Sequence, residues 1–536
     1  MWRTEDATRG LSRRSFLKGS AGAAAGAGLA VTVIGGSGCE DLDDGWDDSA
    51  DVIIMGAGGA GLVAAITAAE EGGEVIVLEK GDVIGGTTAV SGGQIQASGT
   101  LLQQTQVTDD STDKHAAWWL AASEGVADPE LLGLLADEAA DAVAFMENLG
   151  MTYGGLYAVS RIPSVSPDLL RARIHVPEVD PDDVLAGGAR HIELLRRRAE
   201  TLEVRLRLRE TVEALYVHHH KDHEIVGVRT RRRLADGSEE EWRIRARRGV
   251  ILCAGGFDHN REMSRAHSPQ QLWELDDGVC WSVPTNTGDG IRLGMAAGGD
   301  LASGMSATIG YPMATMGASD AVGGLWVNVH GQRFVAEDAH YAFAMRAVFA
   351  QERHLAWAIF DDDTAGLGGA ALGGLFASWS EDLSDELDDG TLVRADTLEA
   401  LGTALGCNGE QLQATVNLWN RDMDRDGVDT LLARSRARTR LGDGPYWALR
   451  IRSANLGSCG GLRINTRAEV RNRRGEVIRG LYAAGMNAGG FIGTFYPGSG
   501  TAIMATLVLG RVAGRNAMGH ATTDVPASSA SAVSLI

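Results

Sequence analysis

The feature that most constrains this chain is an apolar strand that runs directly into a glycine-rich turn. Residues 51–55 read as a buried parallel strand, and residues 62–71 read as the helix that follows the turn. Residues 75–78 read as a second strand, which ends at Glu79. A strand, a glycine turn, a helix and a second strand in such close succession form a βαβ unit. The sequence therefore predicts an α/β fold in which a Rossmann-type domain is built on a parallel sheet.

The turn has the G-x-G-x-x-G pattern of dinucleotide sites and reads Gly56, Ala57, Gly58, Gly59, Ala60, Gly61. Gly56 permits the tight turn, Gly58 lets the backbone approach a pyrophosphate, and Gly61 allows the helix to pack on the sheet. The helix N-terminus offers free N–H groups to the phosphates. We expect Glu79 to accept hydrogen bonds from the adenosine ribose, with Lys80 beside it.

Further glycine clusters extend this site and favour FAD over NAD. Glycine accounts for 71 of the 536 residues, well above the usual share of about 7%. A second loop rich in glycine and hydroxyls follows Glu79, where an NAD domain would run into an ordinary helix. The residues that we expect to hold the rest of an extended dinucleotide, in this loop and in later turns, are Gly86, Thr87, Thr88, Ser91, Gly92, Gly93, Ala254, Gly255, Gly256, Asp289 and Gly485.

Charge and cysteine usage disfavour several other classes of protein. The net charge is −22, and a nucleic-acid partner is disfavoured because a phosphate backbone attracts basic surfaces. The five cysteines show no C-x-x-C spacing. Neither a metal site, a disulfide framework nor a covalently attached c-type haem is therefore indicated.

The first forty residues read as an export signal. Residues 11–18 (Leu-Ser-Arg-Arg-Ser-Phe-Leu-Lys) precede a weakly apolar stretch over residues 19–38. Paired arginines in this context predict that residues 1–39 direct twin-arginine export to the periplasm or cell envelope. Cys39 is either a lipid-attachment site that tethers the protein to a membrane or an incidental residue. Residues 40–50 form an acidic linker.

Five motifs in a fixed order resemble the fumarate reductase and 3-ketosteroid dehydrogenase superfamily of FAD enzymes. They are the Gly56 fingerprint, the loop over residues 85–93, Asn286-Thr-Gly-Asp-Gly290, Gly331-Gln-Arg-Phe334 with Glu337, and Leu481-Tyr-Ala-Ala-Gly485. The resemblance implies a discontinuous FAD-binding domain over residues 51–284 and 448–520. It also implies an inserted α+β substrate cap over residues 285–447, and the chain then ends in a disordered tail over residues 521–536. The FAD is expected to be non-covalent, because the histidine of the family's covalent members is replaced by the Thr87-Thr88-Ala89 segment.

Two departures from the reductases of this superfamily remove charge from the substrate pocket. The proton-donating arginine of those enzymes lies four residues after the motif glutamate, and here Tyr341 stands four residues after Glu337. Their carboxylate-binding histidine precedes a Gly-Gly turn, where this chain has Gly457 or Ser458. A dicarboxylate reductase is therefore disfavoured.

The same positions resemble the 3-ketosteroid Δ1-dehydrogenases. By this resemblance Tyr341 is the base that removes a proton, while the Tyr496 hydroxyl and the Gly500 backbone N–H hold the ketone oxygen. Hydrogen bonds to the carbonyl stabilise developing enolate charge, and Tyr341 needs a pKa below the usual value of about 10. Residues 500–503, Ala502 and Ile503 among them, precede an apolar helical pattern over residues 504–517. We expect the N-terminus of this helix to stabilise the negative charge on reduced flavin. His340 is expected to be a bystander, because adjacent residues on a helix point in different directions.

Some positions leave alternatives open. Tyr153 and Tyr157 are candidates for a further supporting tyrosine of that branch. Met486 stands where the family places a polar residue against the flavin, and Asn487 is an alternative one position later. The cations at Arg171, Arg173 and His175 either serve an anionic substrate or coat a surface helix.

Together these patterns predict an exported FAD-dependent dehydrogenase that desaturates a cyclic ketone, such as a 3-ketosteroid, next to its carbonyl. Its electrons would pass to an acceptor such as a membrane quinone or a redox protein. The alternative is an exported, fumarate-reductase-like flavin reductase that acts on the conjugated double bond of an unidentified substrate; for either hypothesis the expected small-molecule substrate is a hydrophobic ketone or enone. A flavoprotein without catalysis would require that Tyr341 and Tyr496 can be removed without consequence.

Overall fold

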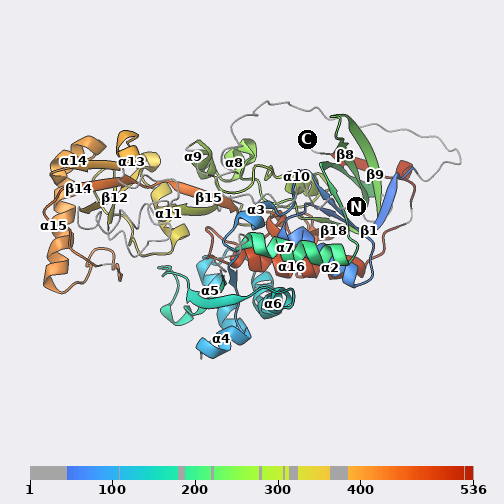
Figure 1. The fold of residues 1–536 in the computed structure, drawn as a ribbon, viewed down its shortest axis with the longest axis horizontal. Coiled ribbons are helices and arrows are strands. Elements are labelled where there is room, and N and C mark those ends of the chain that lie inside the picture. Colours follow the sequence, from blue (N-terminus) through green and yellow to red (C-terminus); the bar gives the residue numbers. More distant parts are fainter. Residues whose placement is uncertain are drawn as a thin grey trace.

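The computed structural model describes residues 45–107, 109–178, 187–218, 223–276, 280–305, 308–312, 324–361, 384–390, 392–436, 438–523 and 525–534. These residues fold into a larger part, which holds a nine-stranded sheet, and a smaller cap, which holds a four-stranded sheet (Figure 1). The predicted export signal, Cys39 and the start of the acidic linker lie outside the described residues.

The large sheet is parallel at its centre, as the βαβ pattern predicts. Its parallel strands are β18 (Val477–Ala483), β9 (Glu239–Leu252), β1 (Asp48–Met55), β2 (Val75–Glu79) and β6 (Arg205–Leu208), in that order. Val52 of β1 pairs with Val75 on one side and with Gly249 on the other. β1 begins before the expected residue 51, because Asp48 already pairs with Ile244 of β9. The α/β fold with a parallel sheet is confirmed.

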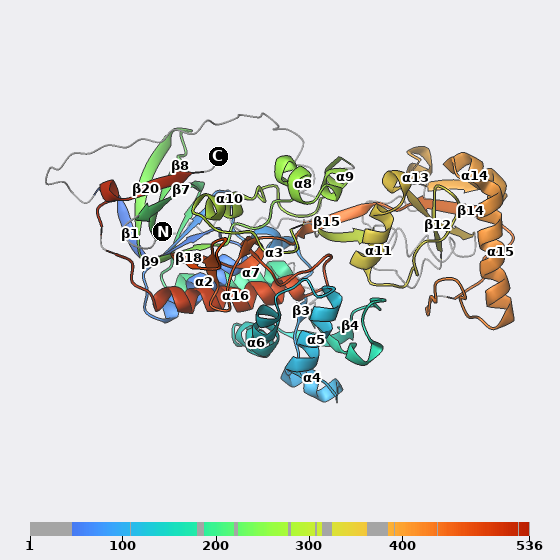
Figure 2. The same ribbon diagram turned by 180° about the vertical axis from the view of Figure 1, so that it is seen from behind.

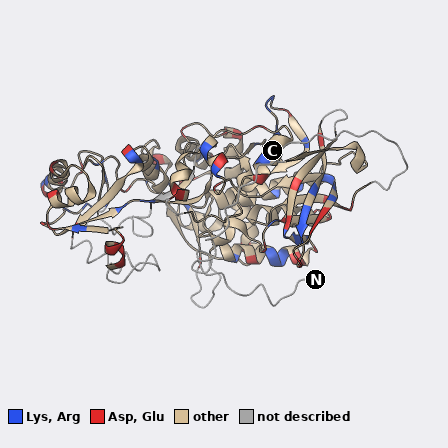
Figure 3. Cartoon of the chain, turned by 90° about the horizontal axis from the view of Figure 1, so that it is seen from above, with Lys and Arg blue, Asp and Glu red and all other residues tan. Residues whose placement is uncertain are grey.

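An antiparallel meander extends this sheet at one edge. β8 (Glu224–Arg233) pairs with β9 and with β7 (Glu210–His218). Acidic and basic side chains are interleaved on these strands (Figure 3). Arg231, for example, donates to Glu213 at 2.5 Å. The meander therefore meets solvent with charges of both signs.

The C-terminal segment joins the meander, which corrects the expected disordered tail for the described residues. β20 (Ser531–Ser534) pairs antiparallel with β7. Glu224 accepts a hydrogen bond from the Thr523 hydroxyl at 2.6 Å and lies 2.9 Å from His520 Nε2. Val525 and Ala527 are buried. The composition suggested disorder, but these few apolar residues and one carboxylate attach the segment.

Three helices pack side by side against the large sheet (Figure 2). They are α2 (Gly59–Glu70), α7 (Gly188–Thr201) and α16 (Thr501–Met518). Glycines let α16 approach the backbone of α2: a Cβ on Gly510 would lie 2.9 Å from Ala60 O, and one on Gly514 would lie 2.6 Å from Ala64 O. No helix in the described part of the chain, α16 included, has the length and apolar character needed to cross a membrane.

A helical layer and a small antiparallel sheet lie beneath α16. The helices are α4 (Leu101–Gln106), α5 (Thr112–Ala122) and α6 (Pro129–Asn148), and the strands are β3 (Ile95–Gln96), β4 (Tyr153–Ala158) and β5 (Ala172–Pro177). The short helix α3 (Gly86–Val90) packs instead against α7. Arg173 on β5 is buried and donates to both carboxylate oxygens of Asp110, at 2.6 and 2.8 Å. The surface-helix alternative for this segment is therefore wrong.

An antiparallel ribbon of β10 (Thr308–Pro312) and β15 (Ser453–Ser458) joins the cap to the larger part. Along the chain, three helices of the larger part precede this ribbon: α8 (Arg261–His267), α9 (Gln270–Asp276) and α10 (Asp289–Ala296). Three short strands follow it: β16 (Leu462–Arg463), β17 (Glu469–Arg471) and β19 (Ala488–Gly489). Ile291 of α10 packs with Phe257 and Met263 of the larger part. The expected cap boundary at residue 285 therefore falls inside the larger part.

The cap is an antiparallel sheet with helices on both faces. Its strands are β11 (Leu325–Asn328), β12 (Ala356–Asp361), β14 (Tyr446–Arg450) and β13 (Leu392–Ala395), in that order, and its helices are α11 (Tyr341–Phe349), α13 (Ser384–Asp388), α14 (Leu398–Leu405) and α15 (Gly409–Arg425). Trp326 and Phe360 pack on one face with residues of α11. Leu325 and Ile359 pack on the other face with residues of α14 and α15. This alternation is the period-two pattern of a sheet buried on both sides.

Candidate active site

The glycine turn between β1 and α2 has room for a ligand at one position. A Cβ on Gly56, whose φ is +100°, would lie 2.5 Å from Cys253 O, and one on Gly61 would lie 1.9 Å from Gly56 O. At Gly58, by contrast, the nearest atom to an added Cβ would be Gly85 O at 3.8 Å. The turn and the helix packing thus require two of the glycines, while Gly58 leaves its backbone open to a pyrophosphate.

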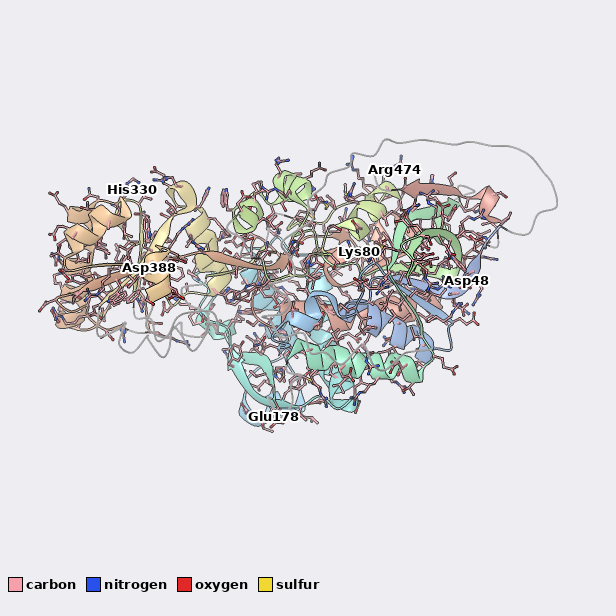
Figure 4. All side chains as sticks on the ribbon, turned by 45° about the horizontal axis from the view of Figure 1, so that its top comes forward. Asp48, Lys80, Glu178, His330, Asp388 and Arg474 are labelled. Atoms are coloured by element: carbon pink, nitrogen blue, oxygen red, sulfur yellow. The ribbon has the colours of Figure 1, made fainter. Side chains whose placement is uncertain are left out.

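The residues at the end of β2 are tied to both neighbouring turns. Glu79 accepts hydrogen bonds from Ala57 N at 2.9 Å and from Gly81 N at 2.7 Å. Lys80, labelled in Figure 4, pairs with Asp289 at 2.7 Å and donates to Thr287 at 2.6 Å. Two predicted site residues 209 positions apart therefore meet at the start of α10.

The second glycine loop lies against the first. Gly85 forms a parallel bridge with Gly58, and α3 starts at Gly86. Asn286 donates to Thr87 Oγ1 at 2.9 Å. The predicted cofactor residues of this loop, namely Gly86, Thr87, Thr88, Ser91, Gly92 and Gly93, form one continuous stretch next to the turn at Gly58.

The turn after β9 is held by a buried amide from the far end of the chain. Asn487 accepts from Ala254 N and donates to Gly255 O, both at 2.6 Å. A Cβ on Gly256 would lie 2.2 Å from Ser458 Oγ. Gly485 has a φ of +58°, and an added Cβ there would lie 2.9 Å from the Ala60 methyl group. Asn487 therefore positions the turn that follows β9, and Gly485 places the returning chain against the first glycine turn.

The two predicted catalytic tyrosines converge although 155 residues separate them. The ring centroids of Tyr341 and Tyr496 are 6.5 Å apart. Tyr341 is the first residue of α11 in the cap, and Tyr496 belongs to the loop before α16 in the larger part. A cavity of about 360 Å³ is lined by Tyr341, Ser499, Tyr157 and other residues of both parts.

The Tyr496 hydroxyl lies at the N-terminus of α16. It accepts a hydrogen bond from Ala502 N at 2.8 Å and retains its own hydrogen for donation. Burial raises the pKa of Tyr496 far above its ordinary value, so the group remains a protonated donor. Gly500 caps this helix with a φ of +87°, and a Cβ there would lie 2.5 Å from Gln96 N. Ala502 and Ile503 follow in the first turn of the same helix.

A buried charge network fixes the segment before Tyr341. Glu337 pairs with Arg333 at 2.7 Å, and Arg333 also pairs with Asp429 at 2.9 Å. Glu337 further accepts from Trp326 N of β11 at 3.0 Å. The Arg-Phe-x-x-Glu motif thus anchors the start of α11 to the cap sheet, and no sequence pattern indicated the Asp429 contact.

Several open alternatives are narrowed by the geometry. Tyr157 lines the cavity, whereas the hydroxyl of Tyr153 is buried away from it. Ser458 donates its backbone N–H to Asp258 at 2.6 Å, and its hydroxyl accepts from Phe257 N at 2.8 Å. Ser458 therefore holds the loop after β9.

His340 is the functional candidate that sequence reasoning missed. We expected it to face away from Tyr341, but both residues line the cavity and their ring centroids are 4.3 Å apart. The rule for adjacent helical residues does not apply, because His340 is the N-cap of α11 with extended φ and ψ of −53° and 133°. A helix-start signal at Tyr341 would have revealed this, but the sequence carries no capping side chain there.

A parallel sheet with glycine turns at the carboxyl ends of β1 and β9 defines a class of dinucleotide-binding enzymes. The model of the FAD binding domain family matches residues 51–503, so the chain belongs to this family and uses FAD. It is an FAD-dependent oxidoreductase of the fumarate reductase and steroid dehydrogenase superfamily. A twin-arginine signal model matches residues 10–30, so the protein is exported by that route.

The relatives of known activity include both reductases and a dehydrogenase of this superfamily. The chain is 29% identical to the digoxin reductase of Eggerthella lenta over 95% of this chain and 97% of that protein. It shares 29% identity and a TM-score of 0.75 with the 3-ketosteroid-Δ4-(5α)-dehydrogenase of Rhodococcus jostii RHA1 in complex with 4-androstene-3,17-dione, over 88% and 97% of the two chains. With the open flavocytochrome c3 fumarate reductase it shares 27% identity and a TM-score of 0.67, over 89% and 80%.

Proposed function

We propose that the protein transfers hydrogen across the carbon–carbon bond next to the carbonyl of a hydrophobic cyclic ketone, in the form of α,β-desaturation of a 3-ketosteroid. The observation that carries this proposal is the closeness of two tyrosine rings: Tyr341 lines the cavity, and the ring centroid of Tyr496 lies 6.5 Å from that of Tyr341. One phenol comes from the cap and the other from the larger part, so the two can act on neighbouring atoms of one substrate.

Tyr496 and the Gly500 N–H polarise the ketone in this proposal. The buried Tyr496 phenol stays protonated. The hydrogen bond that it accepts from the Ala502 N–H makes its own hydroxyl a stronger donor. Hydrogen bonds to the carbonyl oxygen stabilise the enolate charge that develops when a neighbouring proton leaves. The first turn of α16 adds the positive end of a helix dipole.

Tyr341 removes or returns the proton on the carbon next to the carbonyl. FAD, when bound, supplies the chemistry of hydride exchange with the adjacent carbon. Charged groups do not dominate the cavity: Glu337 is paired with Arg333, and Arg436 is exposed at the wall. The cations Arg171 and Arg173 are paired with Asp109 and Asp110 instead. A dicarboxylate is thus poorly matched to this site.

We infer that the cofactor is held by the predicted set of backbone and side-chain groups around the glycine turns. The open approach at Gly58, the adjacent loop at Gly86 and the α16 N-terminus supply a continuous path for an extended dinucleotide. The full set is Gly56, Gly58, Gly59, Ala60, Gly61, Glu79, Lys80, Gly86, Thr87, Thr88, Ser91, Gly92, Gly93, Ala254, Gly255, Gly256, Asp289, Gly485, Ala502 and Ile503.

The test is an anaerobic titration of the FAD-loaded protein with 4-androstene-3,17-dione, with the flavin absorbance as readout. The wild type bleaches. Tyr341→Phe and Tyr496→Phe keep FAD but bleach about 100-fold or more slowly, because each removes an acid–base or carbonyl-polarising group. Tyr446→Phe is the matched control, since its hydroxyl binds Gly442 O within the cap at 2.9 Å. Unchanged rates in both site variants would reject the proposed roles.

A second candidate is reduction of a conjugated double bond at the same site. The similarity to a digoxin reductase over nearly the whole of both chains favours it. In this case the oxidised protein does not respond to the steroid. The dithionite-reduced protein is instead reoxidised by an enone, with the same dependence on Tyr496.

We further propose that electrons leave or enter through a membrane quinone or a redox protein, and that a lipid on Cys39 keeps the exported protein at the membrane. Labelling of producing cells with a clickable palmitate analogue tests the lipid. The wild type is expected to carry the label and Cys39→Ser to lack it. An unlabelled wild type would instead indicate ordinary signal cleavage.

A further inference from the structure

The cavity wall contains a buried imidazole that has no hydrogen-bond partner among the described residues. The side chain of His340 is 1% exposed, and neither of its ring nitrogens has a hydrogen-bond partner among the described residues. Its ring centroid lies 4.3 Å from that of Tyr341 and 6.4 Å from that of Phe495. The ring therefore faces the site between the start of α11 and the loop that carries Tyr496.

Other buried histidines of the larger part are used differently. His175 contacts Thr100 Oγ1 at 2.7 Å through one ring nitrogen and backbone carbonyls through the other. His191 lies 3.0 Å from Gly93 O, and His115 lies 3.2 Å from Ser98 Oγ. Each of these rings has at least one partner. A buried polar group without a partner destabilises the fold, so we expect the partner of His340 to arrive with a ligand.

The chemistry of the ring narrows the kind of ligand. Burial lowers the pKa of His340 to about 3, so the ring is neutral and offers one donor and one acceptor. The nearby Glu337 carboxylate is already bonded to Arg333 and to Trp326 N. A hydroxyl can donate to the bare ring nitrogen or accept from the N–H. A carboxylate would lose its solvation beside an uncharged ring.

We propose that His340 is a substrate-binding residue that hydrogen-bonds a hydroxyl of the substrate close to the bond that reacts at Tyr341. This inference rests on the proposed function, because Tyr341 marks the reacting end of the cavity. The substrate class is then a ring ketone or enone that carries a hydroxyl on or beside the reacting ring. An unsubstituted hydrocarbon ring at that place would leave His340 unpaired.

The test uses unreactive ring ligands and the FAD-loaded protein. Phenol, catechol, resorcinol and hydroquinone are titrated separately, and Kd is read from the perturbation of the flavin spectrum. In the wild type at least one dihydroxybenzene is expected to bind about tenfold more tightly than phenol, which corresponds to about 1.4 kcal/mol. His340→Leu loses this preference, and His340→Gln, which keeps a donor and an acceptor, retains part of it.

Two further measurements separate recognition from a structural role. His340→Leu should have an unchanged or higher Tm without ligand, because an apolar group replaces an unsatisfied one. His330→Leu, an exposed cap position labelled in Figure 4, is the control and should change neither Kd ratio nor Tm.

Three results would overturn the proposal. They are equal affinity or no binding for all four ligands in the wild type, a preference that survives in His340→Leu, and a lower Tm in that variant. Because none of these ligands is turned over, the outcome is separate from that of the proposed function. A wild type without hydroxyl preference but with normal Tyr496-dependent turnover would remove only the role of His340.

Discussion

At the scale of single residues, Glu274 is a buried acid that the proposed chemistry does not use. It lies on α9 with 1% of its surface exposed and accepts a hydrogen bond from Ser453 of the β10–β15 ribbon. Burial, with the nearby negative charge of Asp258 as a further cause, raises its pKa from 4.5 to about 8. Cys280 and Cys459 are the other titratable groups beside this cluster. The folded protein therefore holds a proton that the unfolded chain releases.

This acid predicts a specific pH dependence of stability. Between pH 4.5 and about 8 the folded state binds more protons at Glu274 than the unfolded state, so its contribution to stability is largest at low pH and declines as pH rises through this window. Glu274→Gln removes the decline and raises Tm at pH 8 by at least about 2 °C. Scanning calorimetry from pH 5 to 9 checks this, with the exposed Glu262→Gln as control. Parallel Tm curves for wild type and Glu274→Gln would contradict it.

The sequence identified single residues well where a backbone requirement selects one residue type. Gly56 and Gly61 are required by close backbone contacts, and the pattern around them is local. Tyr341 and Tyr496 were found only through a family resemblance, since no local rule brings residues from two domains together. His340 was assigned to the wrong side, because its direction depends on a backbone angle just outside the helix.

At the scale of elements, the contact between α16 and α2 depends on glycine. A Cβ on Gly514 would meet the backbone oxygen Ala64 O at 2.6 Å, so the helices must separate to accept it. Gly514→Ala is expected to cost about 1–3 kcal/mol and to weaken FAD retention, because α2 begins at the nucleotide turn. Thermal unfolding and the FAD content after gel filtration measure both effects.

The matched control is Gly133→Ala in the second turn of α6. An added methyl group at Gly133 meets no atom within 4 Å. The better helix propensity of alanine then leaves the free energy of unfolding unchanged or raises it by up to about 1 kcal/mol, and Tm changes in the same direction. The same loss of Tm in both variants would show that replacing a helical glycine is enough to destabilise the protein, and that the α16–α2 contact does not set the outcome.

Helices and strands could be predicted where the apolar pattern is strong. They could not be predicted reliably where a few tertiary contacts determine whether a segment is ordered or which part it belongs to. The strand at 51–55 and the helix after it follow from periodicity alone. β20 was assigned to disorder because Ser and Ala dominate its composition, but its pairing with β7 supplies the missing stability. The cap boundary was placed too early because Asp289 starts a helix that packs on the larger part.

At the scale of the whole molecule, a polar contact joins α11 of the cap to the helical layer. Arg346 donates to both carboxylate oxygens of Glu124, at 2.9 and 2.7 Å, and to Thr494 at 2.9 Å. The same guanidinium lies 4.8 Å from the centre of the Phe495 ring, next to Tyr496. The contact therefore joins the part that carries Tyr341 to the part that carries Tyr496.

Breaking this contact should expose the site. In Glu124→Gln we expect iodide to quench the flavin fluorescence about twofold more strongly, because the cap is less firmly held over the cavity. The wild type should approach the variant at high salt, since the pair is partly exposed and is screened. Asp276→Asn, which removes the exposed pair with Arg261, is the control. Identical quenching in wild type and Glu124→Gln would show that the contact does not limit access.

The ribbon that joins the two parts determines where the cap can be exchanged for that of another protein. Pro312 and Ser453 are direct partners in the pairing of β10 with β15. The chain therefore enters the cap and returns from it at two adjacent points. Partners in an antiparallel pair lie about 5 Å apart, a gap that a short Gly-Ser turn can close. We therefore expect that the cap can be exchanged as a unit: the cap of a relative can be joined at these two positions to an unchanged larger part.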